Sequence, residues 1–142
     1  MGHQQLLLLT LGVIIVSIAS AVGMTMFVDN AVQLNRDAVS NDLVYFATRA
    51  MQHYRKPQIF GGGGHSFAAL TMRHLVNKVD ASGVTRNMNG AYQIVSVPSG
   101  NDPLVIKGTG NEVGRDGSSK IVLFMNVWPD SVHIDATHAG SN

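Results

Sequence analysis

The stretch LLLLTLGVIIVSIASAVGMTMFV, residues 6–28, decides the fold of this chain because it is long, apolar and uncharged. No Asp, Glu, Lys or Arg occurs between Met1 and Val28. As an α-helix rising about 1.5 Å per residue, the stretch extends roughly 34 Å, which is enough to cross a hydrocarbon core of about 30 Å. The sequence therefore predicts a helix that lies in lipid or in the apolar core of an assembly.

A cleavable secretory signal is the first alternative for this stretch. Such a signal has a basic segment before a shorter apolar run, and residues 1–5 contain neither Lys nor Arg. Cleavage near Ser20–Gly23 remains an alternative, because these residues are small, as they are at the cleavage site of a secretory signal.

The uneven distribution of charged residues predicts two different environments along the chain. Its 142 residues suggest one domain, and only 13% are charged, against about 25% in soluble domains. All of these charges lie within residues 29–142.

Ten basic and nine acidic residues leave a net charge of +1, which disfavours a nucleic-acid-binding protein. The absence of cysteine excludes disulfide scaffolds, Cys-ligated zinc and thiol catalysis.

The predicted helix continues past the uncharged stretch as an amphipathic segment. One apolar stripe recurs at helical spacing and consists of Val32, Val39, Leu43, Phe46, Ala50 and Tyr54. The sequence predicts a single helix from Gln4 to Arg55, with Pro57 as its stop. At about 75 Å, such a helix is too long for a chain of this size to bury, so it needs a membrane or neighbouring subunits.

The remaining sequence predicts a small head. Gly61–Gly64 is expected to be a flexible neck, and residues 67–79 are expected to form a short amphipathic helix. Strand-like runs follow at Ala91–Val97, Leu104–Lys107, Lys120–Trp128 and, more weakly, Ser131–Ile134. Residues 80–90, 98–103 and 108–119 are expected to be turns and loops.

The order of these elements predicts an α+β fold. A long N-terminal helix, residues 1–57, serves as membrane anchor or filament core and packs on a small antiparallel β-sheet head, residues 58–142. The run Lys120–Trp128 has apolar residues on both faces, which predicts a central strand covered on both sides.

Patterns that would indicate chemistry are weak. His133, Asp135 and His138 form a conceivable metal site, but surface or core histidines are favoured. Acidic residues in the predicted loops are Asp102, Glu112, Asp116 and Asp130. Their spacing matches no calcium loop, so we expect solvated turns. We expect no catalytic residue, no metal site and no cofactor, and an enzyme is the least favoured class.

The layout as a whole resembles the type IV pilin-like proteins, which include type IV pilins and pseudopilins. The features that carry the resemblance are the uncharged helix Leu6–Phe27, its amphipathic continuation Asp29–Arg55 and the sheet Ala91–Ile134. If Met1 is counted as the first residue, Gln5 stands where family members usually carry a glutamate. The basic leader of the family's precursors has no counterpart before the apolar run, and the disulfide loop of many pilins is absent.

The resemblance implies a structural subunit of an extracellular helical filament on the cell surface, with a role in adhesion. Many identical subunits would pack through their apolar helices. Burial from lipid gains far less than burial from water, so filament growth would require the inner-membrane, ATPase-driven assembly machinery of the family. Before assembly, the subunit would reside in the inner membrane.

The assembly interface that the resemblance implies combines the polar start of the helix with its apolar and small residues. It comprises Gln4, Gln5, Leu6, Leu7, Leu9, Leu11, Gly12, Ile14, Ile15, Ile18, Val22, Gly23 and Phe27. Small residues let helices approach closely. Gln4 and Gln5 are expected either to hydrogen-bond to an adjacent subunit or to sit at the membrane–water boundary. In the first case, Gln5→Leu impairs assembly more than Thr10→Val.

The alternative function is a single-span membrane-anchored protein with an extracytoplasmic binding or sensory head. We expect Val32–Tyr54 to separate the two functions, since neighbours would bury this segment in a filament and water would wet part of it in a monomer.

Overall fold

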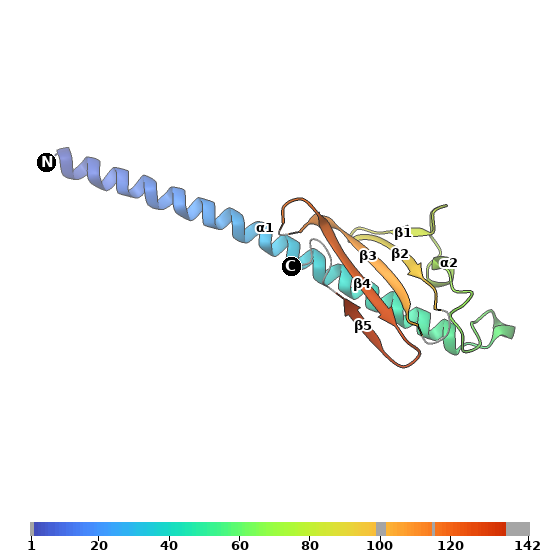
Figure 1. The fold of residues 1–142 in the computed structure, drawn as a ribbon. Coiled ribbons are helices and arrows are strands. Elements are labelled where there is room, and N and C mark those ends of the chain that lie inside the picture. Colours follow the sequence, from blue (N-terminus) through green and yellow to red (C-terminus); the bar gives the residue numbers. More distant parts are fainter. Residues whose placement is uncertain (1, 99–101, 115, 136–142) are drawn as a thin grey trace.

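The computed structural model describes residues 2–98, 102–114 and 116–135. It contains helices α1 (Gly2–Arg55) and α2 (Met72–Leu75), the 3-10 turn η1 (Gln58–Phe60), and strands β1 (Val84–Arg86), β2 (Gly90–Ser96), β3 (Leu104–Val113), β4 (Lys120–Val127) and β5 (Val132–Asp135). The sheet lies against the second half of α1, while the first half projects away from the head (Figure 1). The predicted α+β arrangement is confirmed.

Helix α1 is one uninterrupted element, as predicted. Its buried residues are Val32, Val39, Leu43, Phe46, Ala47 and Ala50, which include most of the predicted apolar stripe, and Tyr54 is half-buried. The helix ends at Arg55 because Pro57 disfavours helical backbone at the residue before it. The backbone N–H of Lys56 makes the last hydrogen bond, to the carbonyl of Gln52.

The five strands form one antiparallel sheet in the order β1-β2-β3-β4-β5, so each strand pairs with its neighbours in sequence. The four predicted strands are present. β1 falls in a segment predicted to be turn-rich, and β3 continues to Val113 through residues expected to be a loop. That continuation uses Gly108 and Gly110, which pair with Tyr92 and Gly90 of β2.

Two glycines of β3 allow α1 to approach the sheet closely. A Cβ on Gly108 would lie 2.8 Å from Cγ1 of Val39, and a Cβ on Gly110 would lie 2.2 Å from Oδ1 of Asn35. Glycine has a low propensity for strands, which explains why the sequence of residues 108–119 predicted a loop. Here the close helix–sheet packing stabilises the strand despite that propensity.

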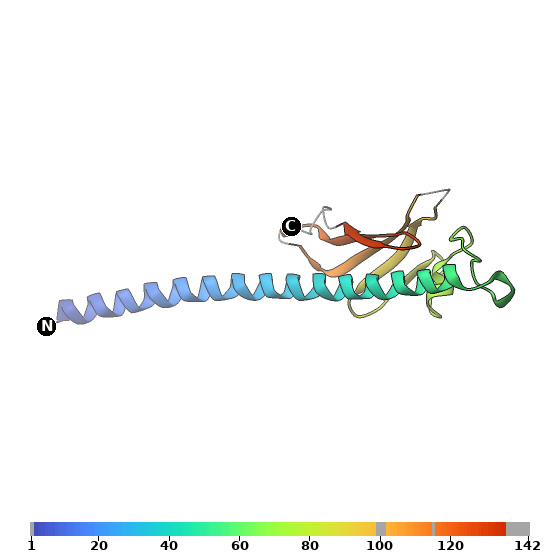
Figure 2. The same cartoon turned by 90° about the horizontal axis from the view of Figure 1, so that it is seen from below.

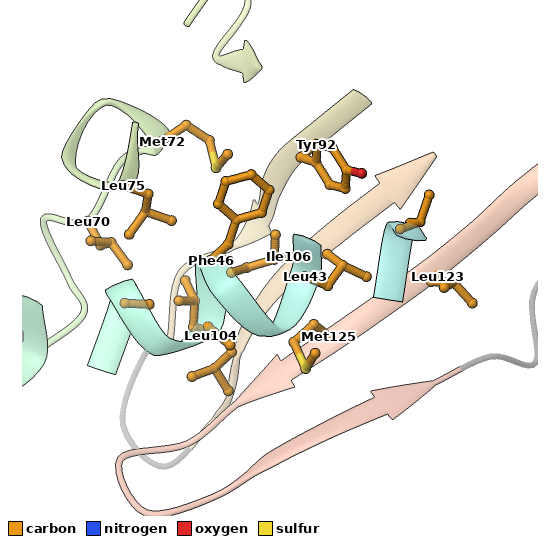
Figure 3. Packing of buried hydrophobic residues seen from close by; sticks show 14 of the residues in the cluster. Leu43, Phe46, Leu70, Met72, Leu75, Tyr92, Leu104, Ile106, Leu123 and Met125 are labelled. Atoms are coloured by element: carbon orange, nitrogen blue, oxygen red, sulfur yellow. The ribbon is translucent and has the colours of Figure 1, made fainter. Parts of the chain in front are cut away.

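The core lies between α1, the inner face of β2–β4 and the segment around α2. Phe46 packs near Tyr92, with ring centroids 5.0 Å apart. Leu70, Met72 and Leu75 close the core at one end, and Figure 3 shows their side chains directed toward Phe46. α1 packs mainly against β3 and β4.

The segment Lys120–Trp128 does contain a strand in the interior of the sheet, but the expectation that it is covered on both sides is wrong. β4 is an interior strand, paired with β3 and β5, but β3 is the middle strand. Ile121, Leu123, Met125 and Val127 are buried against α1, whereas Phe124 and Trp128 on the other face are only half-buried. The helix covers a single face of the sheet (Figure 2).

The helix expected over residues 67–79 is also shorter than predicted. Only Met72–Leu75 is helical, although Phe67 and Leu70 are buried. Thr71 begins the helix as its N-cap, and its backbone N–H donates to Nδ1 of His74 at 3.1 Å. The chain becomes extended at Val76, so one turn of helix suffices to direct these apolar side chains into the core.

Gly61–Gly64 is not a neck between helix and head, because the sheet packs on the helix itself. The run folds back over the C-terminal end of α1. Gly63 N–H donates to the His53 carbonyl at 2.8 Å, and Gly64 N–H donates to the Lys56 carbonyl at 2.9 Å. The glycines therefore cap the helix end.

Candidate membrane-spanning and assembly surface

The first half of α1 has no packing partner in the folded chain. Every residue from Gly2 to Ala31 is exposed. All residues of the predicted assembly interface lie within this half, on a single rigid element (Figure 2). The segment is long and apolar enough to cross a membrane. An exposed apolar surface of this size is typical of segments that contact lipid or other proteins.

The hydroxyl groups in this segment form hydrogen bonds within the helix and need no water as a partner. Thr10 and Ser17 donate to the carbonyls of Leu7 and Val13 at 2.9 and 2.7 Å. Ser20 and Thr25 donate to carbonyls of the preceding turn in the same way, at 2.8 Å each. Hydroxyls paired with their own helix cost little in an apolar medium. These polar residues are therefore compatible with a membrane or a filament core.

Gly12, Ala19 and Gly23 form a narrow strip on the face of α1 that points away from the head, because their spacings of seven and four residues return to the same side of a helix. Within the described chain, nothing lies within 4 Å of a Cβ built on either glycine. Small residues such as these allow a neighbouring helix to approach closely.

Gln4 and Gln5 lie on the first turns of α1 and are exposed. In the part of the chain that the structure describes, neither side chain has a hydrogen-bond partner. Both are therefore available to a neighbouring subunit or to the membrane boundary, and the structure leaves both roles open.

The segment Val32–Tyr54 does not distinguish a filament from a monomer in the way expected. Its apolar stripe is buried by the chain's own sheet. The outer face of the same segment carries Leu34, which is 70% exposed, together with Val44 and Tyr45, which are 44% and 50% exposed. Burial of this outer face, not of the stripe, is what neighbours in a filament would change.

A polar cluster joins α1 to the β1–β2 hairpin. Oδ2 of Asp42 accepts hydrogen bonds from Asn87 and Asn89 at 2.8 Å and from the Tyr92 hydroxyl at 2.6 Å. Nearby, Asn35 donates to the Asn89 carbonyl at 2.9 Å. We call Asp42, Asn87, Asn89 and Tyr92 the Asp42 cluster. It holds the head in one position along the helix.

Sequence reasoning missed the Asp42 cluster. The hairpin turn contains Asn89–Gly90, a dipeptide typical of tight turns, and this part of the signal was available. Asp42 lies beside the apolar stripe and resembles any solvated helical aspartate. Its partners are 45 to 50 residues further along the chain, so no local pattern connects them.

The candidate metal and calcium residues do not come together. No group of three or more metal-ligating side chains occurs among residues 2–98, 102–114 and 116–135. His133 and Asp135 lie on β5, and His138 falls outside the described residues. Asp116 accepts backbone N–H bonds from Ser118 and Ser119, as a turn residue does.

Comparison with known proteins identifies no relative of this chain. No protein-family model, no curated protein and no solved structure matches this chain.

Proposed function

We propose that the chain is the structural subunit of an extracellular helical filament of the type IV pilus kind, with the uncharged halves of α1 packed together in its core. The observation that carries the proposal is that every residue from 2 to 31 is exposed on a helix whose other half packs one face against a folded head. Head and helix form a club-shaped subunit (Figure 1). Copies packed through the helices would leave their sheets on the outside of the filament. The exposed sheets would then determine what the filament adheres to.

Three further features support this proposal. The strip of Gly12, Ala19 and Gly23 favours close helix packing on the side away from the head. The internally bonded hydroxyls allow the segment to leave lipid without exposing unpaired polar groups. Leu34, Val44 and Tyr45 add exposed apolar side chains to the outer face of α1 beyond the length needed for a membrane.

The subunit would first reside in the inner membrane through the same segment. Lipid is already apolar, so transfer of the segment to a filament core gains little free energy. An assembly machinery with an ATPase is therefore part of the proposal. No nucleic acid is expected as a partner, because the chain carries only a net charge of +1.

A single-span membrane-anchored protein with an extracytoplasmic binding or sensory head is the second candidate. One helix that can cross a membrane favours it, and this candidate needs no assembly. In this case the outer face of α1 around Leu34 stays in water.

Thiol labelling distinguishes the two candidates, since the natural chain contains no cysteine. We expect Leu34→Cys to react slowly with a maleimide in material sheared from cells. Met88→Cys is the matched control, because Met88 is 94% exposed at the hairpin turn. Negative-stain imaging of the same material should show filaments. Recovery of the chain from membranes alone, with both thiols equally reactive, would contradict the filament and favour the anchored monomer.

A further inference from the structure

A hollow of about 200 Å³ lies at the C-terminal end of α1, far from the exposed half of the helix. Its lining residues are Arg49, Gln52, His53, Lys56, Gly61 and His74. The volume exceeds the roughly 30 Å³ that one water molecule occupies in the liquid. Four of the lining side chains are basic, and the described lining includes no carboxylate. This combination is unusual in a chain with nearly balanced charge.

The basic groups around the hollow are not neutralised by the chain itself. Within the described residues, neither Arg49 nor Lys56 forms an ion pair. Nη1 of Arg49 donates to the Leu75 carbonyl at 2.9 Å, and its guanidinium lies over the ring of Tyr45. These contacts fix the orientation of Arg49 and leave its other N–H donors for a ligand.

The end of a helix normally disfavours anions, because its last carbonyls carry partial negative charge. At the end of α1 most of these carbonyls accept hydrogen bonds. The glycine run and the residue after it donate to the carbonyls of His53, Tyr54 and Lys56 at 2.8 to 2.9 Å. The hydrogen-bonded cap therefore reduces the repulsion that an anion would meet at this end.

The tautomer of His74 favours an anion over a metal ion. Nδ1 of His74 accepts a hydrogen bond from the Thr71 backbone N–H, so Nε2 carries the proton and is a donor. The ring of His53 lies 4.9 Å from that of His74, centroid to centroid. A cation would meet Arg49 and Lys56 at close range, whereas an oxyanion would be attracted by both.

We propose that this hollow binds a phosphate or sulfate group through Arg49, Lys56 and the two imidazoles. Two exposed apolar residues, Ile59 and Phe60, lie on η1 directly before Gly61 at the rim. A phosphate group has two sources that fit this rim, the free ion and the headgroup of a phospholipid. The site is independent of how α1 assembles, since all its residues belong to the head and the adjoining end of the helix.

The test uses the full chain in nanodiscs of zwitterionic lipid, with imidazole resonances followed by NMR during addition of inorganic phosphate at constant ionic strength. We expect saturable shifts of the His53 and His74 resonances. Lys56→Gln should weaken the affinity about tenfold, as loss of one charge-assisted hydrogen bond predicts. The matched control is Lys120→Gln, which removes an exposed lysine at the start of β4 and should leave the affinity unchanged.

The second part of the test identifies the source of the phosphate group. The nanodiscs are mixed with phosphatidylglycerol or phosphatidylcholine vesicles and separated by flotation. Capture by phosphatidylglycerol alone that is lost in Lys56→Gln supports a lipid headgroup, and saturable phosphate shifts without capture support the free ion. Absence of saturable shifts, equal effects of the two lysine variants, or shifts produced by zinc and not by phosphate would overturn the proposal.

Discussion

The carboxylate of Asp42 on α1 accepts a 2.6 Å hydrogen bond from the hydroxyl of Tyr92 on β2, fifty residues away in sequence. Burial and the neighbouring carboxylate raise the pKa of Tyr92 well above its usual range, so the phenol remains a donor at all physiological pH values. The two amides of Asn87 and Asn89 donate to the same carboxylate oxygen. A half-buried aspartate therefore fixes the position of the hairpin on the helix.

We expect Asp42→Asn to lower the free energy of unfolding of the head by about 2 kcal/mol, because the replacement weakens three charge-assisted hydrogen bonds, one of them from the buried Tyr92. Tyr92→Phe, which removes one donor, should cost about 1 kcal/mol. Denaturant unfolding of the full chain in detergent measures both. The control is Asp37→Asn. Among the described residues its carboxylate accepts a hydrogen bond only from the exposed Gln33, so the replacement should change the free energy of unfolding by less than about 0.5 kcal/mol. Equal losses for Asp37→Asn and Asp42→Asn would contradict a special role for the cluster.

The Asp42 cluster also predicts a dependence of stability on pH. Burial, the largest influence, raises the pKa of Asp42, but hydrogen bonds from Tyr92, Asn89 and Asn87 outweigh it and hold the pKa below its ordinary value of 3.8. The unfolded chain then binds a proton more readily than the folded one. The stabilisation is therefore complete above pH 3.8 and is lost as the pH falls through the lower pKa of the folded state.

The stability difference between the natural chain and Asp42→Asn should accordingly be constant near neutral pH and shrink in acid. Unfolding curves of both proteins across this pH range measure it. A difference that grows on acidification would be inconsistent with the lowered pKa of Asp42.

Gly108→Ala should destabilise the head by about 2 kcal/mol through overpacking. The added methyl group would lie 2.8 Å from Cγ1 of Val39 and 3.2 Å from Leu43 and Tyr92. Val39 is β-branched within a helix and has little rotational freedom to yield. Gly23→Ala is the control, because its surroundings are open and alanine favours helix. Thermal unfolding of the head should separate the two variants, and a neutral Gly108→Ala would show that the helix can move away from the sheet.

Filament yield should depend on the strip of small residues, Gly12, Ala19 and Gly23, on α1. Gly12→Leu places a large side chain on the face that points away from the head, and it should reduce the amount of sheared filament strongly without changing membrane insertion. Ile14→Leu, on the face toward the head and of equal volume, should have little effect. Quantitative blotting of sheared and membrane fractions measures both. Normal filament yield from Gly12→Leu would contradict close packing at this strip.

Gln5→Leu should reduce filament yield more than Thr10→Val. The Thr10 hydroxyl already bonds to the Leu7 carbonyl at 2.9 Å and needs no partner from another subunit. Gln5 is exposed, and within the described residues its amide has no partner. The same fractionation decides this comparison, and unchanged yield from Gln5→Leu would assign that residue to the membrane boundary.

The titration of His53 provides a separate prediction. Burial lowers the pKa of His53, and the positive charges of a protonated His74 and of Lys56 lower it further. The imidazole should therefore be neutral at pH 7. Lys56→Gln should raise the pKa of His53 toward its ordinary value, whereas Lys120→Gln should not. NMR titration of the imidazole measures this shift, and identical titrations in the two variants would show that Lys56 lies too far away to act.

The long helix and its two-part character were determined by the sequence alone. The charge-free run, the stripe from Val32 to Tyr54 and the proline at position 57 are local patterns, and helix periodicity converts them directly into a structure. The antiparallel strands of the head were also recognisable, since alternation along a strand is local as well. β1 was not predicted, and β3 extends to Val113 through residues expected to be a loop.

Other features were decided only by tertiary structure. β3 runs through Gly108 because α1 packs against it, although glycine by itself disfavours a strand. The helix after Phe67 is one turn long because the Thr71 cap and the core set its limits. The Asp42 cluster and the basic hollow join residues that are far apart in sequence. Such contacts depend on where the chain returns in space, and the periodicity of a single segment carries no information about that.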